Sequence, residues 1–165
     1  MSPADVPARQ AVQLGAAWAG VAIENAMLGA AHALANPLTA THSIVHGQAV
    51  GMMLPHVVRL NAAACDERYA ELLAELEPAL PAGPKGLAGL AGLAGPASEP
   101  AGERLARWLE EVVAAGGLVA TLSGLRLPEI DIKTLAAAAA TQWTGSFNPV
   151  PVGVDQLARL YEAAR

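Results

Sequence analysis

Apolar residues run almost without interruption through the first part of the chain. No proline occurs between Ala8 and Ala35, and the apolar side chains point nearly all the way round a helix rather than along one stripe. Pro7 suits the first turn of a helix, whereas Pro37 is expected to end one. The pattern therefore predicts one long helix over residues 8–35, buried on every side at the centre of the core.

Helical spacing also dominates the rest of the sequence. Residues 36–45 are predicted to be a loop because they combine a proline with Ser and Thr. Spacing and end signals place the later helices at about residues 46–64, 66–77, 101–115, 118–125, 128–143 and 155–164. No segment alternates apolar and polar residues as a strand would. The predicted fold class is all-α, a bundle of about six to seven helices forming one domain over residues 1–165.

Residues 78–100 are low in complexity. They contain the run GLAGLAGLAG with five prolines around it, and glycine at that frequency disfavours a stable helix. This segment is predicted to be a Gly/Pro-rich loop within the domain.

Composition excludes several functions. The net charge is −5 and no Lys/Arg cluster stands out, so we expect no nucleic-acid partner. Arg9 and Glu24 interrupt the apolar N-terminal run, so no membrane partner is expected.

The single cysteine, Cys65, excludes an internal disulfide and is interpreted as chemically inert. The first ten residues lack the basic and apolar pattern of an export signal, which favours a cytoplasmic location.

All four histidines lie within residues 27–61, where Arg59 is the only charged residue. They are His32, His42, His46 and His56. No Asp, Glu, Lys or Arg occurs between Glu24 and Arg59. An imidazole in an apolar setting needs a hydrogen-bond partner or a metal ion. The stretch therefore predicts a buried polar site.

Two of these histidines are candidate metal ligands. His32 lies near the end of the first predicted helix and His46 begins the next, so their imidazoles could converge on one divalent ion. Two imidazoles are fewer than a zinc site normally has, so further ligands would have to come from elsewhere. His42 and His46 would share a face only if residues 42–46 were helical, which the preceding loop pattern disfavours. His56 is interpreted as a core or interface residue. On the residues alone, a metal at His32 and His46 stays open.

Two longer segments resemble the iron-containing, or group III, alcohol dehydrogenases, whose fold is shared with dehydroquinate synthase. The first is AIENAMLGAAHALANPLTATHSIVHGQAVGMMLPHVVRLNA, where the family has Gly-x-x-His on a helix, a Pro-Leu loop, then His-Gly and Leu-Pro-His-Val before Arg and Asn. The second, QWTGSFNPVPVGVDQLARLYEAA, is similar to the family's C-terminal Asn-Pro turn and last helix. The resemblance covers nearly the whole chain. It implies the C-terminal, metal-binding helical domain of an NAD(P)-dependent enzyme that interconverts alcohols and aldehydes.

The resemblance also implies a ligand set. In the family one Asp and three His hold a divalent metal, Fe(II) or Zn, and the last two of those histidines match His32 and His46. The Asp, the first His and the dinucleotide-binding domain precede the matched region, so both the metal site and the NAD(P) site are expected to be incomplete here. The chain is therefore expected to be incomplete as a catalyst by itself.

Other positions follow or depart from the family pattern. Asn36 stands where the family often has a histidine thought to act in proton transfer or near the nicotinamide, and a polar contact to substrate or water is expected of it. Val150 replaces the usual Arg. Gly153 replaces a capping Ser or Thr, which should weaken the last helix by up to ~1 kcal/mol. Ile23 and Phe147 are the candidates for the substrate pocket.

Two functional hypotheses follow. The first is the metal-binding part of an iron-type alcohol dehydrogenase. The second is a non-catalytic helical module, derived from that family, that acts through assembly. Under either hypothesis the apolar first helix predicts a partner, which is a second copy of the chain or a separate N-terminal dinucleotide-binding chain.

Overall fold

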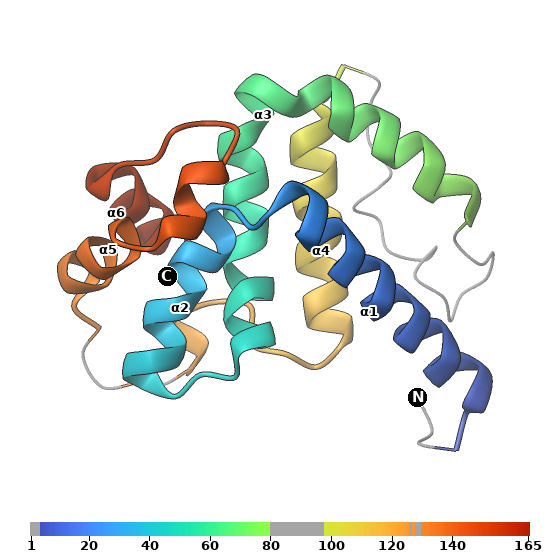
Figure 1. Ribbon diagram of the computed structural model, residues 1–165, viewed down its shortest axis with the longest axis horizontal. Helices are drawn as coiled ribbons and strands as arrows, with labels where there is room; N and C mark the ends of the chain where they lie inside the picture. The colour runs from blue at the N-terminus through green and yellow to red at the C-terminus, as the bar shows by residue number, and fades with distance from the viewer. Residues whose placement is uncertain (1–3, 80–97, 126, 128–129) are drawn as a thin grey trace.

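The computed structural model describes residues 4–79, 98–125, 127 and 130–165, and over these ranges it contains helices and no strand (Figure 1). In chain order the elements are α1 (Val6–Ala26), α2 (Ala30–His42), α3 (His46–Ala79), α4 (Ala101–Ala115), the 3-10 helix η3 (Ser123–Leu125), α5 (Ile132–Ala140), the 3-10 helix η4 (Trp143–Phe147) and α6 (Val154–Ala163). The predicted all-α class is confirmed. Most of the predicted loop over residues 78–100 lies outside the described residues.

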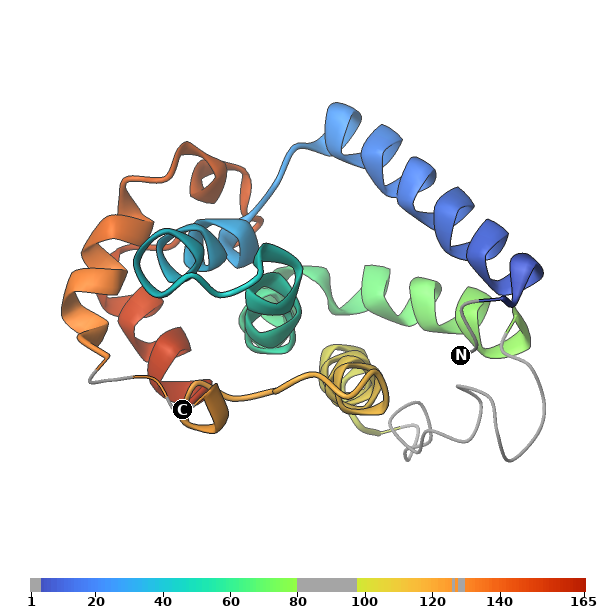
Figure 2. The same cartoon turned by 90° about the horizontal axis from the view of Figure 1, so that it is seen from below.

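The first predicted helix is two helices. The chain turns at Met27, whose φ of 62° lies in the left-handed region, and the axes of α1 and α2 differ by 112°. None of α1's residues is buried, and Trp18 keeps 65% of its surface exposed. Figures 1 and 2 show α1 leading away from the other helices. The prediction of one long helix buried on every side was therefore wrong. Apolar residues all round a helix are typical of a helix buried in its own domain, but also of a helix that another chain or domain buries.

Whether any helix could span a membrane depends on the same two helices, α1 and α2. Within the described ranges, no single helix is both long and apolar enough to span a membrane. Only α1 and α2 taken together, across their bend, have the length and composition for one.

The predicted loop over residues 36–45 is mostly helix. α2 continues through Pro37 and ends at His42, and Ser43 then adopts the left-handed conformation with its N–H bonded to the carbonyl of Thr39. Proline removes one helical hydrogen bond and crowds the preceding turn, which is why the sequence predicted an end here. Pro37 and Leu38 are both buried, and we attribute the persistence of the helix to that burial.

α3 replaces two predicted helices. It runs unbroken from His46 to Ala79, and the residues at the expected break, Cys65 and Asp66, lie inside it. Its axis changes direction, so that its first half packs among the other helices and its second half leads away (Figures 1 and 2). Cys65 is buried, as an inert cysteine would be.

The main core forms where α2, the first half of α3, α5 and α6 meet. It includes Leu34, Leu38, Met53, Leu135 and Leu157, all at most 2% exposed. A smaller cluster joins α3 to α4 and comprises Val58, Leu73, Ala101, Leu105 and Ala106. The helices that carry the candidate histidines are therefore held by the main core.

Polar contacts fasten α4 to α3. The Asp66 carboxylate accepts hydrogen bonds from the backbone N–H groups of Ala101 (3.1 Å) and Gly102 (2.7 Å), and so caps a helix that has no side-chain cap of its own. Arg59 donates to Glu103 (2.8 and 2.9 Å) and to Glu110 (2.5 and 3.2 Å), which joins the same two helices again.

The C-terminal elements follow the predictions in part. α4 has the predicted bounds, and α6 differs by one residue at each end. The helix predicted over residues 118–125 is only the short η3, and the one predicted over 128–143 is α5, which begins after the Asp131 cap. At the start of α6, the Gly153 N–H donates to the side chain of Gln156 (3.1 Å), although glycine offers no cap itself.

Candidate metal site

His32 and His46 lie next to each other. His32 is in the first turn of α2, His46 is the first residue of α3, and their ring centroids are 5.4 Å apart with the planes inclined by 50°. The tight connection between α2 and α3 turns the chain back on itself, which brings together two histidines that are separated in sequence. The pairing expected from the sequence is thus present in the fold.

The surroundings of His32 favour a neutral imidazole. His32 is partly buried, and its pKa is lowered first by burial and then by the neighbouring His46. His46 is exposed, and its Nδ1 lies 3.5 Å from the hydroxyl of Thr39, at the long limit for a hydrogen bond. A neutral imidazole is the form that binds a metal ion.

The donor set fits part of a metal site. Two adjacent imidazoles suit Fe(II) or Zn, but in the ranges that the structure describes no group of three or more His, Cys, Asp or Glu residues could hold a metal ion. Further ligands would therefore have to come from outside these ranges. The metal role of His32 and His46 stays a prediction.

The other two histidines lie apart from this pair. His42 ends α2, and its Nδ1 is 2.6 Å from the hydroxyl of Thr41. It does not share a helix with His46, because residues 43–45 separate α2 from α3. The alternative of a shared helical face for His42 and His46 is therefore wrong.

His56 faces a different hollow, an open cavity of about 480 Å³ that it lines with Glu110, Glu111 and Thr121 among others. Burial and the nearby Arg59 lower its pKa, and Glu110 partly opposes them. The groups that surround His56 therefore do not include His32 or His46.

Asn36 lies one helical turn beyond His32. Its side-chain amide donates a hydrogen bond of 2.8 Å to Oε1 of Gln142, which joins α2 to the residue just before η4. The contact to substrate or water that the sequence suggested stays a prediction.

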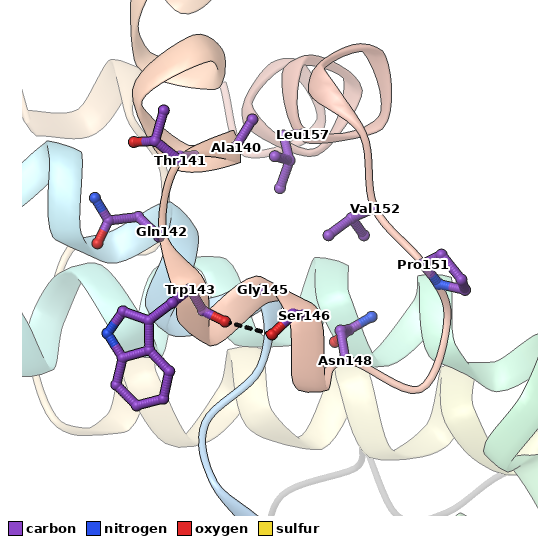
Figure 3. Close-up of a pocket in the computed structure, with 11 residues that line it drawn as sticks. Ala140, Thr141, Gln142, Trp143, Gly145, Ser146, Asn148, Pro151, Val152 and Leu157 are labelled. Atoms are coloured by element: carbon purple, nitrogen blue, oxygen red, sulfur yellow. Dashed lines mark hydrogen bonds between the residues drawn. The ribbon is translucent and has the colours of Figure 1, made fainter.

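A second hollow of about 340 Å³ lies between the end of α5, η4, residues 148–152 and α6 (Figure 3). Val152 and Leu157 supply apolar side chains to it, and Gln142 and Ser146 supply polar ones. Phe147 is 49% exposed and packs edge-on against Trp143 with a centroid separation of 5.8 Å, and it does not line this hollow. Ile23 is 39% exposed on α1. Their assignment to a substrate pocket stays a prediction.

One buried polar group was missed by reasoning from the sequence. Asn148 and Asn61 form a reciprocal amide pair, with Asn148 donating over 2.7 Å and Asn61 over 3.1 Å. Asn148 Oδ1 also accepts from the N–H of Ala30 (3.2 Å), and its Nδ2 donates to the carbonyl of Val150 (2.7 Å). Both asparagines lie in the two segments that resemble the family, and that resemblance is the sequence feature that could have pointed to them.

The sequence of the chain matches a known protein family. The model for the C-terminal part of the iron-containing alcohol dehydrogenase family matches residues 1–165. The chain belongs to this family. The resemblance read from the sequence is confirmed, and this family member carries the His32–His46 pair on α2 and α3.

Individual relatives agree with the family match. Long-chain-alcohol dehydrogenase 1 of Geobacillus thermodenitrificans is 30% identical over 161 residues, which make up 97% of this chain and 38% of the relative. The crystal structure of a 1,3-propanediol oxidoreductase superposes with a TM-score of 0.71 at 25% identity, and covers 89% of this chain and 35% of that one. A sulfoacetaldehyde reductase from Bifidobacterium kashiwanohense, solved in complex with NAD+, shares the fold with a TM-score of 0.59 at 24% identity, over 82% of this chain and 30% of that one. The chain thus spans less than two fifths of the length of these relatives.

Proposed function

We propose that residues 1–165 form the metal-binding helical part of an NAD(P)-dependent iron-type alcohol dehydrogenase, which interconverts alcohols and aldehydes. The observation that carries this proposal is the 5.4 Å approach of His32 and His46 within a chain of this family. His32 and His46 would hold a divalent ion, Fe(II) or Zn, through one imidazole nitrogen each. The proposed location is the cytoplasm.

When bound, such an ion would supply Lewis-acid polarisation of an alcohol or carbonyl oxygen, and NAD(P) would supply the hydride chemistry. The residues of this chain would orient the site. Thr39 approaches His46 at Nδ1, so Nε2 would be the nitrogen available to the ion. Asn36 and Gln142 place a hydrogen-bonded amide pair one turn from His32. The remaining ligands and the NAD(P) site are proposed to come from a dinucleotide-binding part of the protein or a separate chain.

Metal binding can be tested directly on the 165-residue chain. Co(II) is a suitable probe because its visible absorption reports the number and type of ligands. We expect one Co(II) per chain, with an affinity reduced at least about tenfold by His32→Ala and by His46→Ala. His42→Ala is the matched control, since it removes an imidazole from the end of the same helix, and it should bind as the unsubstituted chain does. Equal binding by all four proteins would refute the assignment of the ligands.

NAD(P)H binding tests the larger claim. The chain is expected to gain nicotinamide binding and alcohol oxidation when it is combined with a dinucleotide-binding partner of the same family. Failure to gain either activity while Co(II) still binds at His32 and His46 would favour the second hypothesis, a non-catalytic helical module. The family match does not favour that module.

The exposed apolar side chains of α1 support a proposal about partners. Val12, Leu14 and Trp18 are each at least 60% exposed on a helix that has no buried residue. Apolar surface gathered in this way is typical of an interface. We propose that it is covered by a second copy of the chain or by a separate N-terminal dinucleotide-binding chain.

A further inference from the structure

Asn61 and Asn148 are hydrogen-bonded to each other in both directions although both residues are at least 92% buried, with Asn61 5% and Asn148 8% exposed. Each amide both donates to and accepts from the other, and Asn148 makes two further bonds, to Ala30 and to Val150. A buried amide with unmet hydrogen bonds is costly, so such a pair holds its partners in one arrangement. It joins α2, α3 and the turn that follows η4.

Asn148 takes over the capping of α2. Gly29, the residue at the N-cap, offers no side chain to the first turn, and the otherwise unpaired N–H of Ala30 donates to Asn148 Oδ1 instead. The approach is close, because a Cβ added at Gly29 would lie 3.1 Å from the same oxygen. Ala30 is two residues before His32, so the cap is fixed at the turn that carries this histidine.

The pair also sets the relation of α2 to α3. The short connection through residues 43–45 joins the end of α2 to the start of α3, next to His46. Asn61 lies about four helical turns further along α3 and is tied through Asn148 to the opposite end of α2. α2 is thus connected to α3 at both of its ends, which leaves the two helices little freedom to slide or rotate against each other.

We propose that Asn61 and Asn148 are positioning residues that hold His32 against His46, and so pre-form half of the metal site before any ion binds. The effect on metal affinity rests on the proposed function, whereas the effect on the distance between the two rings does not. Residues that hold the ligands of a metal ion in place can raise its affinity without touching the ion.

The first experiment measures the ring contact in the metal-free chain. With chelator present, proton NMR of selectively labelled histidine should show a nuclear Overhauser cross-peak between the His32 and His46 rings. Asn148→Ala and Asn61→Ala should each reduce its intensity at least about twofold, because the distance dependence is steep and the helices are no longer tied. Gly29→Ala is a milder third variant that only displaces the Asn148 oxygen, and it should weaken the same peak if the other two fail to fold.

The control separates positioning from general stability. Asp66→Ala removes the cap of α4 and should lower the unfolding temperature, yet it should leave the cross-peak unchanged because it touches neither α2 nor Asn148. An undiminished cross-peak in folded Asn148→Ala or Gly29→Ala would overturn the proposal, as would an equal loss in Asp66→Ala.

Co(II) titration of the same variants is the second experiment. Asn148→Ala and Asn61→Ala should weaken binding about tenfold or more, and Asp66→Ala should not. Affinity unchanged in the asparagine variants would also overturn the positioning role. If the unsubstituted chain binds no Co(II) at His32 and His46, the proposed function fails, and the cross-peak still decides the positioning role by itself.

Discussion

The hydroxyl of Tyr161 donates a hydrogen bond of 2.6 Å to the main-chain carbonyl of Leu34, so the last helix is bonded directly to the helix that carries His32. Both residues are fully buried. Burial raises the pKa of Tyr161, because the phenolate would be poorly solvated there, and the hydroxyl therefore remains a donor. α6 thus supports the helix that carries His32.

Replacing Tyr161 with Phe tests this bond. The ring would still fill its place in the core, while the carbonyl of Leu34 would lose one partner. We expect the free energy of unfolding to fall by about 1 kcal/mol, as measured by urea denaturation. Ser146→Ala, which removes an exposed hydroxyl bonded to Trp143, should change it by less than about 0.5 kcal/mol. Equal stability of Tyr161→Phe and the unsubstituted chain would contradict a contribution from the bond.

Stability should depend on pH through the Arg59–Glu103 contact. The hydrogen bond from Arg59 holds the pKa of Glu103 below its usual value in the folded chain. The folded state therefore binds this proton less readily than the unfolded state does. The stabilisation is present above the ordinary carboxyl pKa and is lost as the pH falls through the lowered folded value.

Comparing unfolding at about pH 7 and about pH 3 measures this contribution. Glu103→Gln should lose less stability on acidification than the unsubstituted chain. The difference should be at most about 1 kcal/mol, because the Glu103 side chain is 42% exposed and water screens the pair. Glu162→Gln is the control, since its ion pair with Arg165 is more exposed and joins no two helices. Identical pH dependence in Glu103→Gln and the unsubstituted chain would contradict the prediction.

Close packing of α4 on α3 requires Gly102. A Cβ at this position would lie 2.6 Å from the Cβ of Ala62, a methyl group that cannot swing aside. Gly102→Ala should therefore destabilise the chain by about 1–3 kcal/mol, measured by thermal or urea unfolding. Gly20→Ala is the matched control, because nothing lies within 4 Å of its added Cβ on α1, and it should be neutral or stabilising. Similar effects of the two substitutions would argue against the tight contact.

Association through α1 is the fourth prediction. Light scattering should find the chain larger than a monomer, because the exposed apolar side chains of α1 gain by being covered. Val12→Asp and Trp18→Asp should shift the chain toward monomer. Val45→Asp is the control, since Val45 is 72% exposed but lies outside α1, and it should leave the size unchanged. A monomer that binds no apolar dye would contradict the prediction.

Local signals identified much of the architecture. The all-α class followed from helical spacing. The same spacing located α6 closely, and α4 was located by Pro100 at its start and by the two glycines at its end. The candidate pair His32 and His46 also came from the sequence, since a family motif and an uncharged setting both marked those positions.

Helix continuity could not be predicted in the same way. Proline at position 37 disfavours a helix locally, yet α2 continues through it among buried neighbours. The turn at Met27 needs a left-handed backbone that methionine rarely adopts, so no local preference announced it. At Pro37 the local preference of the backbone was overruled by burial in the core.

The sequence by itself determined the helical class, the family and the two histidines, because these depend on residue type and spacing along one segment. Only the tertiary structure decided that α1 is uncovered, that the two imidazoles lie 5.4 Å apart, and that Asn148 caps α2 from 118 residues away. The physical reason is that burial and hydrogen bonding depend on contacts between segments that are distant in the sequence. The local sequence around a residue does not specify which distant segment will pack against it.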